Sequence, residues 1–216
     1  MFTGFTQSTQ SFFWDLQFNN ERPWFQAHKE EFELCLNRPF RELANDCFAL
    51  VDESFPLSGL EVHISRIYRD ARRLYGRGPY KDNLWFSIKN RSNGYEGPSF
   101  FFEINPAFWC YGLGCYFERA EGTERFRRAV DANPAAFQRL AADAAGMEGF
   151  CVEGPEYKRP KGDYSPEINA WYNRKHAHVI CRHDYDELLL SESLPGRIAE
   201  DFISLMPLYD YFRSIT

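Results

Sequence analysis

The sequence has no long hydrophobic run, and this absence argues against a membrane-spanning protein. No stretch of the 216 residues approaches the roughly 20 consecutive apolar residues that a transmembrane helix needs. Residues 1–10 lack the basic start and the apolar run of a secretory signal peptide. With a mean hydropathy of −0.52, the chain is expected to be a soluble, cytoplasmic protein without a membrane partner.

The sequence also lacks the usual motifs of nucleophilic and nucleotide chemistry. It has no G-x-S-x-G, no P-loop, no G-x-G-x-x-G and no cysteine beside a recognisable histidine signature. None of the six cysteines forms a C-x-x-C pair, and most lie inside apolar patterns, where a reduced thiol behaves as a small hydrophobic side chain. We therefore predict reduced, mostly buried thiols, and the sequence indicates no cofactor.

Acidic residues outnumber basic ones, 31 to 25, but one segment of the chain is rich in basic residues. The net charge of −6 argues against binding of nucleic acid or acidic membranes over the whole surface. Residues 58–91 hold eight basic and three acidic residues, a local charge of +5, so the rest of the chain carries −11. A basic stretch inside an acidic protein suits one bound anion better than a polyanion.

The hydrophobic patterns predict one α+β domain that spans residues 1–216. Residues 1–57 repeat apolar side chains at helical spacing and predict a helical N-terminal part. Residues 58–119 change to period-two alternation and predict an antiparallel sheet, while residues 120–216 are expected to form helices, a basic loop and one strand. The expected fold is an antiparallel sheet of about five strands, with helices from both chain ends packed mainly on one face.

Four apolar runs in the middle of the chain predict an antiparallel meander, and a fifth strand is expected later. The four runs cover residues 60–65, 84–89, 100–105 and 108–117, and the fifth strand is expected at residues 176–181. Residues 149–166 are rich in Gly, Pro and Lys and predict a loop. Ser193 is expected to cap a last helix, which Pro207 should kink.

The most distinctive stretch is residues 66–81, which contain five arginines and one lysine. If the strand pattern continues past residue 64, Arg66 and Tyr68 share the apolar face of Val62 and Ile64. An arginine on an apolar face must be paired or must meet a ligand, because an unpaired buried charge is costly. Several converging guanidinium groups form a site for phosphate or carboxylate.

Nine residues are candidates for anion binding. Asp70 would orient one arginine, Tyr80 would donate a hydrogen bond, and a second basic loop would close over the anion. The candidates are Arg66, Arg69, Asp70, Arg72, Arg77, Tyr80, Lys81, Lys158 and Arg159.

Each basic segment has an alternative, structural interpretation. In one alternative the arginines form a salt-bridge network, with Arg66 or Arg69 held by Asp70, Glu103 or Glu118. In the other, residues 157–164 are a solvated surface loop. Both glutamates are also possible acid or base groups, although nothing in the sequence ranks them above other carboxylates.

The arginine-rich stretch resembles the defining motif of an uncharacterised family that is widespread in bacteria, domain of unknown function 2461. That motif reads R-x-x-R-D-x-R-F and continues, after a short gap, with Asp or Asn and K-x-x-Y. Arg66, Arg69, Asp70, Arg72 and Tyr80 match it. The resemblance extends along most of the chain, including residues 19–29, 158–164 and 207–212. It implies no activity, because none is established for the family.

Three positions depart from that motif. Arg73 stands where the family has Phe, Gly76 where it has Asp or Asn, and Arg77 where it has Lys. Arg77 keeps the charge, whereas Gly76 weakens any role that needs a carboxylate or an amide.

Histidines offer a weaker signal for a metal site. His176 and His178 lie two residues apart on one face of an expected strand, and with His183 or Asp184 they could ligate a metal ion. This spacing is not specific, and the family resemblance gives it no support, so no metal site is predicted.

Two functions from different classes follow from these patterns, and neither identifies a nucleophile. The first is binding of, or catalysis on, a phosphate- or carboxylate-bearing small molecule at the arginine cluster. The second is a protein- or nucleic-acid-interaction module that uses the basic loop and exposed aromatic residues such as Trp109 and Tyr111. Net acidity disfavours nucleic acid, although a local basic strip can suffice.

Overall fold

The computed structural model describes residues 1–56, 58–70, 72, 74, 76–90, 96–117 and 120–216. Within them, six strands form one sheet in the order β1-β2-β3-β4-β6-β5, and all neighbouring strands are antiparallel. The α+β class is therefore confirmed, with one strand more than the sequence predicts. The strands are β1 (Leu60–Ile64), β2 (Leu84–Asn90), β3 (Gly97–Ile104), β4 (Trp109–Tyr116), β5 (Phe150–Glu153) and β6 (Ala177–His183).

Helices precede, interrupt and follow these strands. In the described residues, no helix combines the length and the apolar character that crossing a membrane requires. The helical elements are α1 (Gln7–Phe18), α2 (Arg22–Ala27), α3 (Lys29–Phe32), the π-helical turn η1 (Glu33–Asn37), α4 (Arg38–Ser54), α5 (Ala120–Ala132), α6 (Pro134–Ala145), α7 (Pro166–Tyr172), α8 (Leu194–Ser204) and α9 (Met206–Ile215).

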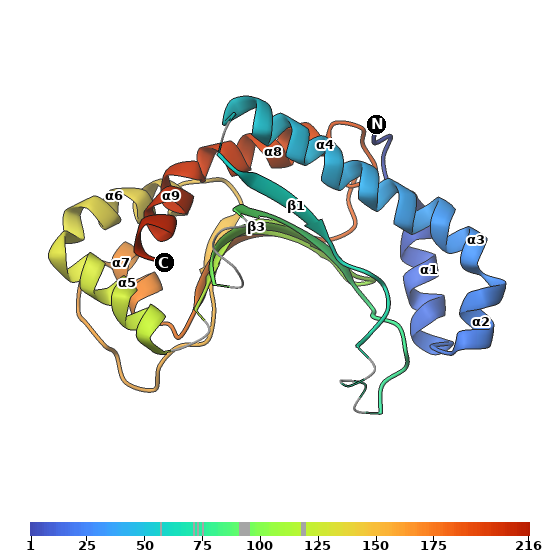
Figure 1. Cartoon of the computed structure of the whole chain (residues 1–216), viewed down its shortest axis with the longest axis horizontal. Helices are drawn as coiled ribbons and strands as arrows, with labels where there is room; N and C mark the ends of the chain where they lie inside the picture. Colours follow the sequence, from blue (N-terminus) through green and yellow to red (C-terminus); the bar gives the residue numbers. More distant parts are fainter. Residues whose placement is uncertain (57, 71, 73, 75, 91–95, 118–119) are drawn as a thin grey trace.

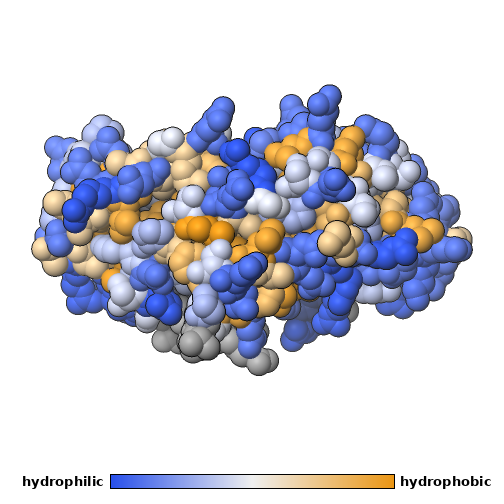
Figure 2. All heavy atoms as spheres, turned by 90° about the horizontal axis from the view of Figure 1, so that it is seen from above, coloured by the Kyte–Doolittle hydropathy of each residue, from blue (hydrophilic) through white to orange (hydrophobic). Residues whose placement is uncertain are grey.

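The sheet is arched, and the long helices cover its convex face (Figure 1). Helix α4 contacts β1 and β2, α8 contacts β4, and α9 contacts β3. Helices α1–α3 lie beyond one end of the arch, and α5–α7 lie beyond the other. Helices from both chain ends thus pack on one face, as predicted. Seen from above, the outer side of this layer is mostly hydrophilic, with smaller hydrophobic areas between (Figure 2).

Alternate residues of the central strands point into a core of aromatic rings. Phe86 and Phe102 stack with their centroids 5.4 Å apart, and Phe40 of α4 packs against both. Phe100 stacks on Phe202 of α8 at 4.8 Å. These rings are completely buried, and each contributes about 1.5–3 kcal/mol by leaving water. The period-two pattern in the sequence therefore marks the convex face, which needs a helical cover.

Part of the segment predicted to be a loop, residues 149–166, is strand β5 (Phe150–Glu153). Four residues pair antiparallel with β6 at the edge of the sheet. The strand is too short for alternation to be recognised, and glycines with positive φ flank it, Gly149 at 80° and Gly154 at 138°. In the sequence, glycines at these positions indicate turns, so the short strand between them is not recognised.

The C-terminal helix is divided rather than kinked. Helix α8 ends at Ser204 and α9 begins at Met206, with Pro207 in its first turn. A proline lacks the N–H that an interior helical position donates, but the first turn of a helix has no partner for that group. Pro207 therefore begins a new helix instead of bending the previous one.

The cysteines have the state that the sequence predicts. All six thiols are free, and five of them are buried, while Cys151 is exposed. Burial, together with a smaller effect of the Glu31 charge, raises the pKa of the Cys35 thiol to about 12.

Candidate functional site

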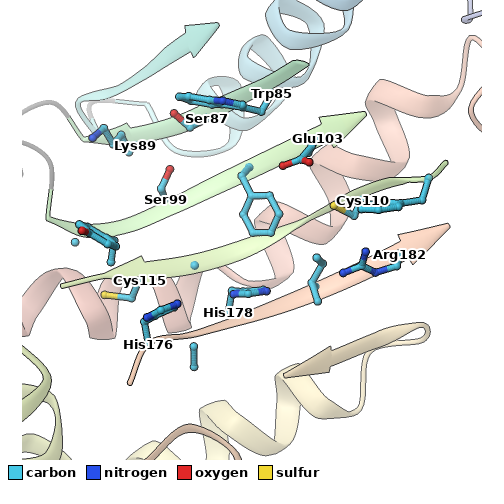
Figure 3. Close-up of a pocket in the computed structure, with 17 residues that line it drawn as sticks. Trp85, Ser87, Lys89, Ser99, Glu103, Cys110, Cys115, His176, His178 and Arg182 are labelled. Atoms are coloured by element: carbon cyan, nitrogen blue, oxygen red, sulfur yellow. The ribbon is translucent and has the colours of Figure 1, made fainter. Parts of the chain in front are cut away.

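The concave side of the sheet carries a hollow of about 530 Å³ (Figure 3). Strands β2, β3, β4 and β6 line it with the side chains that point away from the helices. The lining combines aromatic rings with polar and charged groups. It includes Trp85, Ser87, Lys89, Ser99, Phe101, Glu103, Phe108, Cys110, His178 and Arg182.

One row of the lining crosses all four strands. Trp85 lies opposite Glu103, Glu103 opposite Cys110, and Cys110 opposite Arg182. Because strand residues alternate between faces, a fixed register brings these side chains to the same side. The row places a carboxylate between an indole ring and a guanidinium group.

Two glycines of β4 shape the floor of the hollow. A Cβ atom at Gly114 would have His178 Cβ as its nearest neighbour, at 3.4 Å, which is ordinary contact. At Gly112 a Cβ atom would lie 2.0 Å from the backbone oxygen of Val179. Gly112 is therefore required for the close approach of β4 and β6, whereas Gly114 leaves space that faces the hollow.

The β6 end of the hollow is electrostatically balanced. The guanidinium group of Arg182 lies 3.1 Å from Glu153 Oε2 and 4.3 Å above the centroid of the Phe108 ring. His178 Nε2 lies 3.8 Å from the same carboxylate oxygen. Burial lowers the pKa of His178, and Glu153 only partly opposes this shift. At neutral pH the imidazole is therefore uncharged, and Arg182 already has a carboxylate partner.

The β2 end has an excess of positive charge. The Lys81 ammonium lies 5.8 Å from the centroid of Trp85, whose ring lines the hollow. Burial lowers the pKa of Lys81, and the nearby charges of Arg69 and Arg66 lower it further, while Glu103 opposes them. Among the described residues, no carboxylate forms an ion pair with this ammonium. An anion placed here would relieve the repulsion between the cations.

The family described as Conserved hypothetical protein (DUF2461) matches residues 8–211. The chain belongs to this family. The membership expected from the arginine-rich motif is thus confirmed, and no curated protein matches the chain.

Two arginines of the arginine-rich stretch interact with other groups of the protein. Arg69 donates from Nε to the Tyr80 carbonyl oxygen at 2.7 Å and from a terminal nitrogen to Asp82 at 3.0 Å. Its side chain is only 13 % exposed. Arg72 makes a bidentate pair with Asp70, at 3.0 and 2.8 Å, but its side chain is 88 % exposed. Arg69 therefore fastens the segment, whereas Arg72 forms a surface pair.

Arg66 corrects the prediction of an arginine on the apolar face. Strand β1 ends at Ile64, and the alternation then shifts by one residue, so that Ser65 and Ile67 are buried while Arg66 and Tyr68 are exposed. The side-chain hydroxyl of Ser65 accepts a hydrogen bond from the Trp85 N–H at 2.9 Å, which fixes the shift. Arg66 thus remains solvated near Lys81.

Tyr80 belongs to the core and not to a binding surface. Its ring is buried and stacks on Phe25 at 4.1 Å. Asn20 holds its backbone through two hydrogen bonds of 3.0 Å. The structure thus gives its ring a packing role, and the donation of a hydrogen bond by its hydroxyl to an anion stays a prediction.

The second basic loop lies far from the first. Lys158 and Arg159 are exposed and belong to a segment that Asn173 tethers, accepting a hydrogen bond from the Lys161 N–H at 2.6 Å. Figure 1 shows this segment near α5–α7, across the arch from residues 65–83. The prediction that it closes over the arginine stretch is therefore wrong.

Arg77, Arg73 and Glu118 were also singled out in the sequence. Arg77 is exposed, while Arg73 and Glu118 lie outside the described residues.

Two aromatic residues predicted to be exposed are buried. Trp109 is 0 % and Tyr111 is 1 % exposed, because both point to the convex face of β4. Trp109 donates from Nε1 to the Asp184 carbonyl oxygen at 3.0 Å.

The histidines do not form a metal site with those of their neighbours that the structure describes. Within the described part of the chain, no group of three or more His, Cys, Asp or Glu side chains is arranged to hold a metal ion.

Sequence reasoning missed most of the hollow. Ser87, Ser99, Phe108 and Arg182 were not candidates, although Ser87 and Phe108 lie in predicted strands and Ser99 and Arg182 lie directly beside two others. The available signal was that each residue follows or precedes a core-facing residue. What the sequence does not supply is the register that brings the four strands together.

Proposed function

We propose that this DUF2461 protein binds a small anionic molecule in the concave hollow. The phosphate or carboxylate group lies near Lys81, and an apolar part rests on Trp85 and Phe101. The observation that carries this proposal is the Lys81 ammonium, which is partly buried near two further cations, lies 5.8 Å from the Trp85 ring of the hollow and forms no ion pair among the described residues. A bound anion supplies the missing countercharge.

The size and lining of the hollow support a small-molecule ligand. Ligand pockets commonly enclose about 300–1,000 Å³ and combine apolar walls with a few polar groups. The hollow has aromatic walls at Trp85, Phe101 and Phe108 and a flat floor at Gly114. An ordinary solvated sheet face carries polar residues without such a recess.

The position of the anionic group follows from which cations are already paired. Arg69 is bound to Asp82, Arg72 to Asp70 and Arg182 to Glu153. A ligand at any of these guanidinium groups competes with a carboxylate of the protein. Lys81 involves no such competition, since Glu103 acts on it without forming an ion pair.

Calorimetric titration with phenyl phosphate, using inorganic phosphate for comparison, tests the proposal. The Lys81→Met variant is expected to weaken phenyl phosphate binding about tenfold or more, since a hydrogen bond to a charged group contributes about 1.5–3 kcal/mol. Arg72→Met is the matched control, because it removes a cation that already has a partner. No binding by the unmodified protein, or an equal loss in both variants, contradicts the proposal.

A second candidate function is binding of single-stranded nucleic acid along residues 66–77. Tyr68 is 52 % exposed, and Arg66, Arg72 and Arg77 are exposed in the same segment. Exposed aromatic rings among cations allow bases to stack while phosphates are neutralised. This function predicts salt-sensitive retention of an RNA oligonucleotide that Tyr68→Ser reduces and Lys81→Met leaves largely unchanged.

A further inference from the structure

Three polar side chains form a hydrogen-bonded chain on the face of β6 that points away from the hollow. The Cys181 sulfur lies 3.1 Å from His183 Nε2, and His183 Nδ1 lies 3.1 Å from Asp186 Oδ2. Cys181 and His183 are two residues apart in one strand, so they share a face, opposite to that of Arg182. The order thiol, imidazole, carboxylate is the arrangement that activates a nucleophile.

The hydrogen bonds define a tautomer that suits a general base. A carboxylate only accepts hydrogen bonds, so Asp186 requires the proton of the neutral imidazole on Nδ1 of His183. Nε2 then carries the lone pair and accepts from the Cys181 thiol. The proton of the thiol is thus directed at the atom that would remove it.

The imidazole and the carboxylate are each held in place by other groups. Trp109 stacks flat on His183, with ring centroids 4.1 Å apart and an interplanar angle of 9°. Asp186 uses its other oxygen, Oδ1, to accept a hydrogen bond from the Leu189 N–H at 3.0 Å. These contacts limit the motion of the imidazole and of the carboxylate, as a preorganised site requires.

The thiol is protonated at rest and needs this base. Burial raises the pKa of Cys181 and Asp201 reinforces this shift, while the neighbouring Tyr111 hydroxyl opposes it. Tyr111 donates its hydroxyl proton to Asp201 at 2.7 Å, and Arg197 lies 3.0 Å from that carboxylate. The sulfur therefore lies in a connected polar network and not in a purely apolar core.

The backbone of Gly149 lies against the Cys181 sulfur. Gly149 is exposed, has a positive φ of 80°, and would place a Cβ atom 3.0 Å from the Cys181 sulfur. Any side chain there would press on the thiol and shield it. Because Gly149 is exposed and lies against the sulfur, the thiol is close to the surface, although Cys181 itself is only 3 % exposed.

We propose that Cys181 is a nucleophile for small acyl esters, with His183 as its general base and Asp186 as a positioning residue. The sulfur forms a bond to the acyl carbon while its proton moves to His183 Nε2. The bond from that carbon to the ester oxygen breaks, and the leaving alcohol takes the proton. Water then attacks the thioester with His183 as base, which releases the acid and restores the thiol.

This site is independent of the function proposed for the hollow. The hydrogen-bonded chain lies on the convex side of β6, and it shares no residue with the concave lining. Sequence motifs did not reveal it, because a Cys-x-His pair in a strand followed by Asp three residues later matches no familiar signature. Failure of one proposal therefore leaves the other unchanged.

Acylation by p-nitrophenyl acetate, mapped by mass spectrometry of the folded protein, tests the assignment. Cys151 is an exposed thiol that hydrogen-bonds to the Glu153 carboxylate at 3.7 Å and has no imidazole partner among the described residues, so it is the internal reference. We expect Cys181 to acquire the acetyl group at least about tenfold faster than Cys151, because general base catalysis contributes about 10²–10⁴-fold. Exposure alone predicts the opposite order, so slower labelling of Cys181 than of Cys151 overturns the proposal.

The His183→Gln variant and the Asp186 variants test the assigned roles. His183→Gln should reduce Cys181 acetylation at least about tenfold while the Cys151 rate stays constant. Asp186→Asn should also slow acetylation of Cys181, and Asp186→Glu should restore part of it. An unchanged Cys181 rate in folded His183→Gln contradicts the base role. If that variant fails to fold, the comparison with Cys151 in the unmodified protein decides.

Discussion

The two faces of the sheet are built from the same strands but carry different side chains. On the convex face, Phe86, Phe100 and Phe102 are completely buried under helices α4 and α8. On the concave face, Phe101 and Glu103 alternate with them and line an open hollow. The convex rings form the core beneath the helices, whereas the open hollow leaves Phe101 and Glu103 within reach of a ligand.

Neighbouring phenylalanines in β3 give the largest expected contrast between the faces. Phe100→Ala should reduce the free energy of unfolding by about 3–5 kcal/mol, because it leaves a cavity beneath α8. Phe101→Ala should reduce it by about 1 kcal/mol or less, since its ring faces the hollow. Urea unfolding of both variants measures the difference. Equal losses would remove the distinction between the two faces.

Two glycines of β4 allow a similar comparison between a tightly packed position and one that faces the hollow. Gly112→Ala should destabilise the protein by about 1–3 kcal/mol, because the added Cβ atom meets the Val179 oxygen. Gly114→Ala should change stability by about 0.5 kcal/mol or less, since its Cβ atom enters the hollow. Thermal unfolding of the two variants compares them. A large loss for Gly114→Ala would mean that the hollow is tightly packed.

Two arginines of residues 66–81 also differ in how much they are expected to contribute to stability. Arg69→Met should cost about 2 kcal/mol of unfolding free energy, because the Tyr80 carbonyl oxygen and Asp82 lose a charged donor. Arg72→Met should have no measurable effect, since its pair with Asp70 is solvated. Chemical denaturation measures both. A destabilised Arg72→Met variant would show that the surface pair is structural after all.

The smallest expected effect concerns pH. Burial lowers the pKa of His178 below its ordinary value of 6.5 in the folded state. Below pH 6.5 the unfolded chain therefore binds a proton that the folded protein resists, and stability falls as pH decreases. His178→Gln should make the melting temperature decline less between pH 7 and pH 5. A steeper decline in the variant would contradict the sign of this shift.

The meander and the convex core are predictable from alternation, because burying large rings on one face imposes a period of two. Strand β5 is not predictable in this way, since four residues between glycines carry too few alternations. The hollow cannot be predicted from the sequence either. Trp85, Glu103 and Arg182 come together only through a register between strands that are distant in the chain.

The arginine-rich stretch illustrates a second limit. Its composition predicts an excess of charge, and Lys81 retains that excess next to Trp85. The pairing of Arg69 with Asp82 spans thirteen residues and depends on the loop doubling back, with Lys81 N–H donating to the Ile67 oxygen at 2.7 Å. Which cations are neutralised is thus decided by the fold of the loop, and spacing alone does not reveal it.

The most direct test of the proposed hollow is a titration of the isotope-labelled protein with phenyl phosphate, followed through backbone amide chemical shifts. A ligand in the hollow should shift the amides of Lys81, Phe101, Gly114 and His178 together and with one dissociation constant. Shifts confined to Arg72 and Arg77, with these four amides unmoved, would place the anion on the outer surface of the basic loop and contradict the proposal.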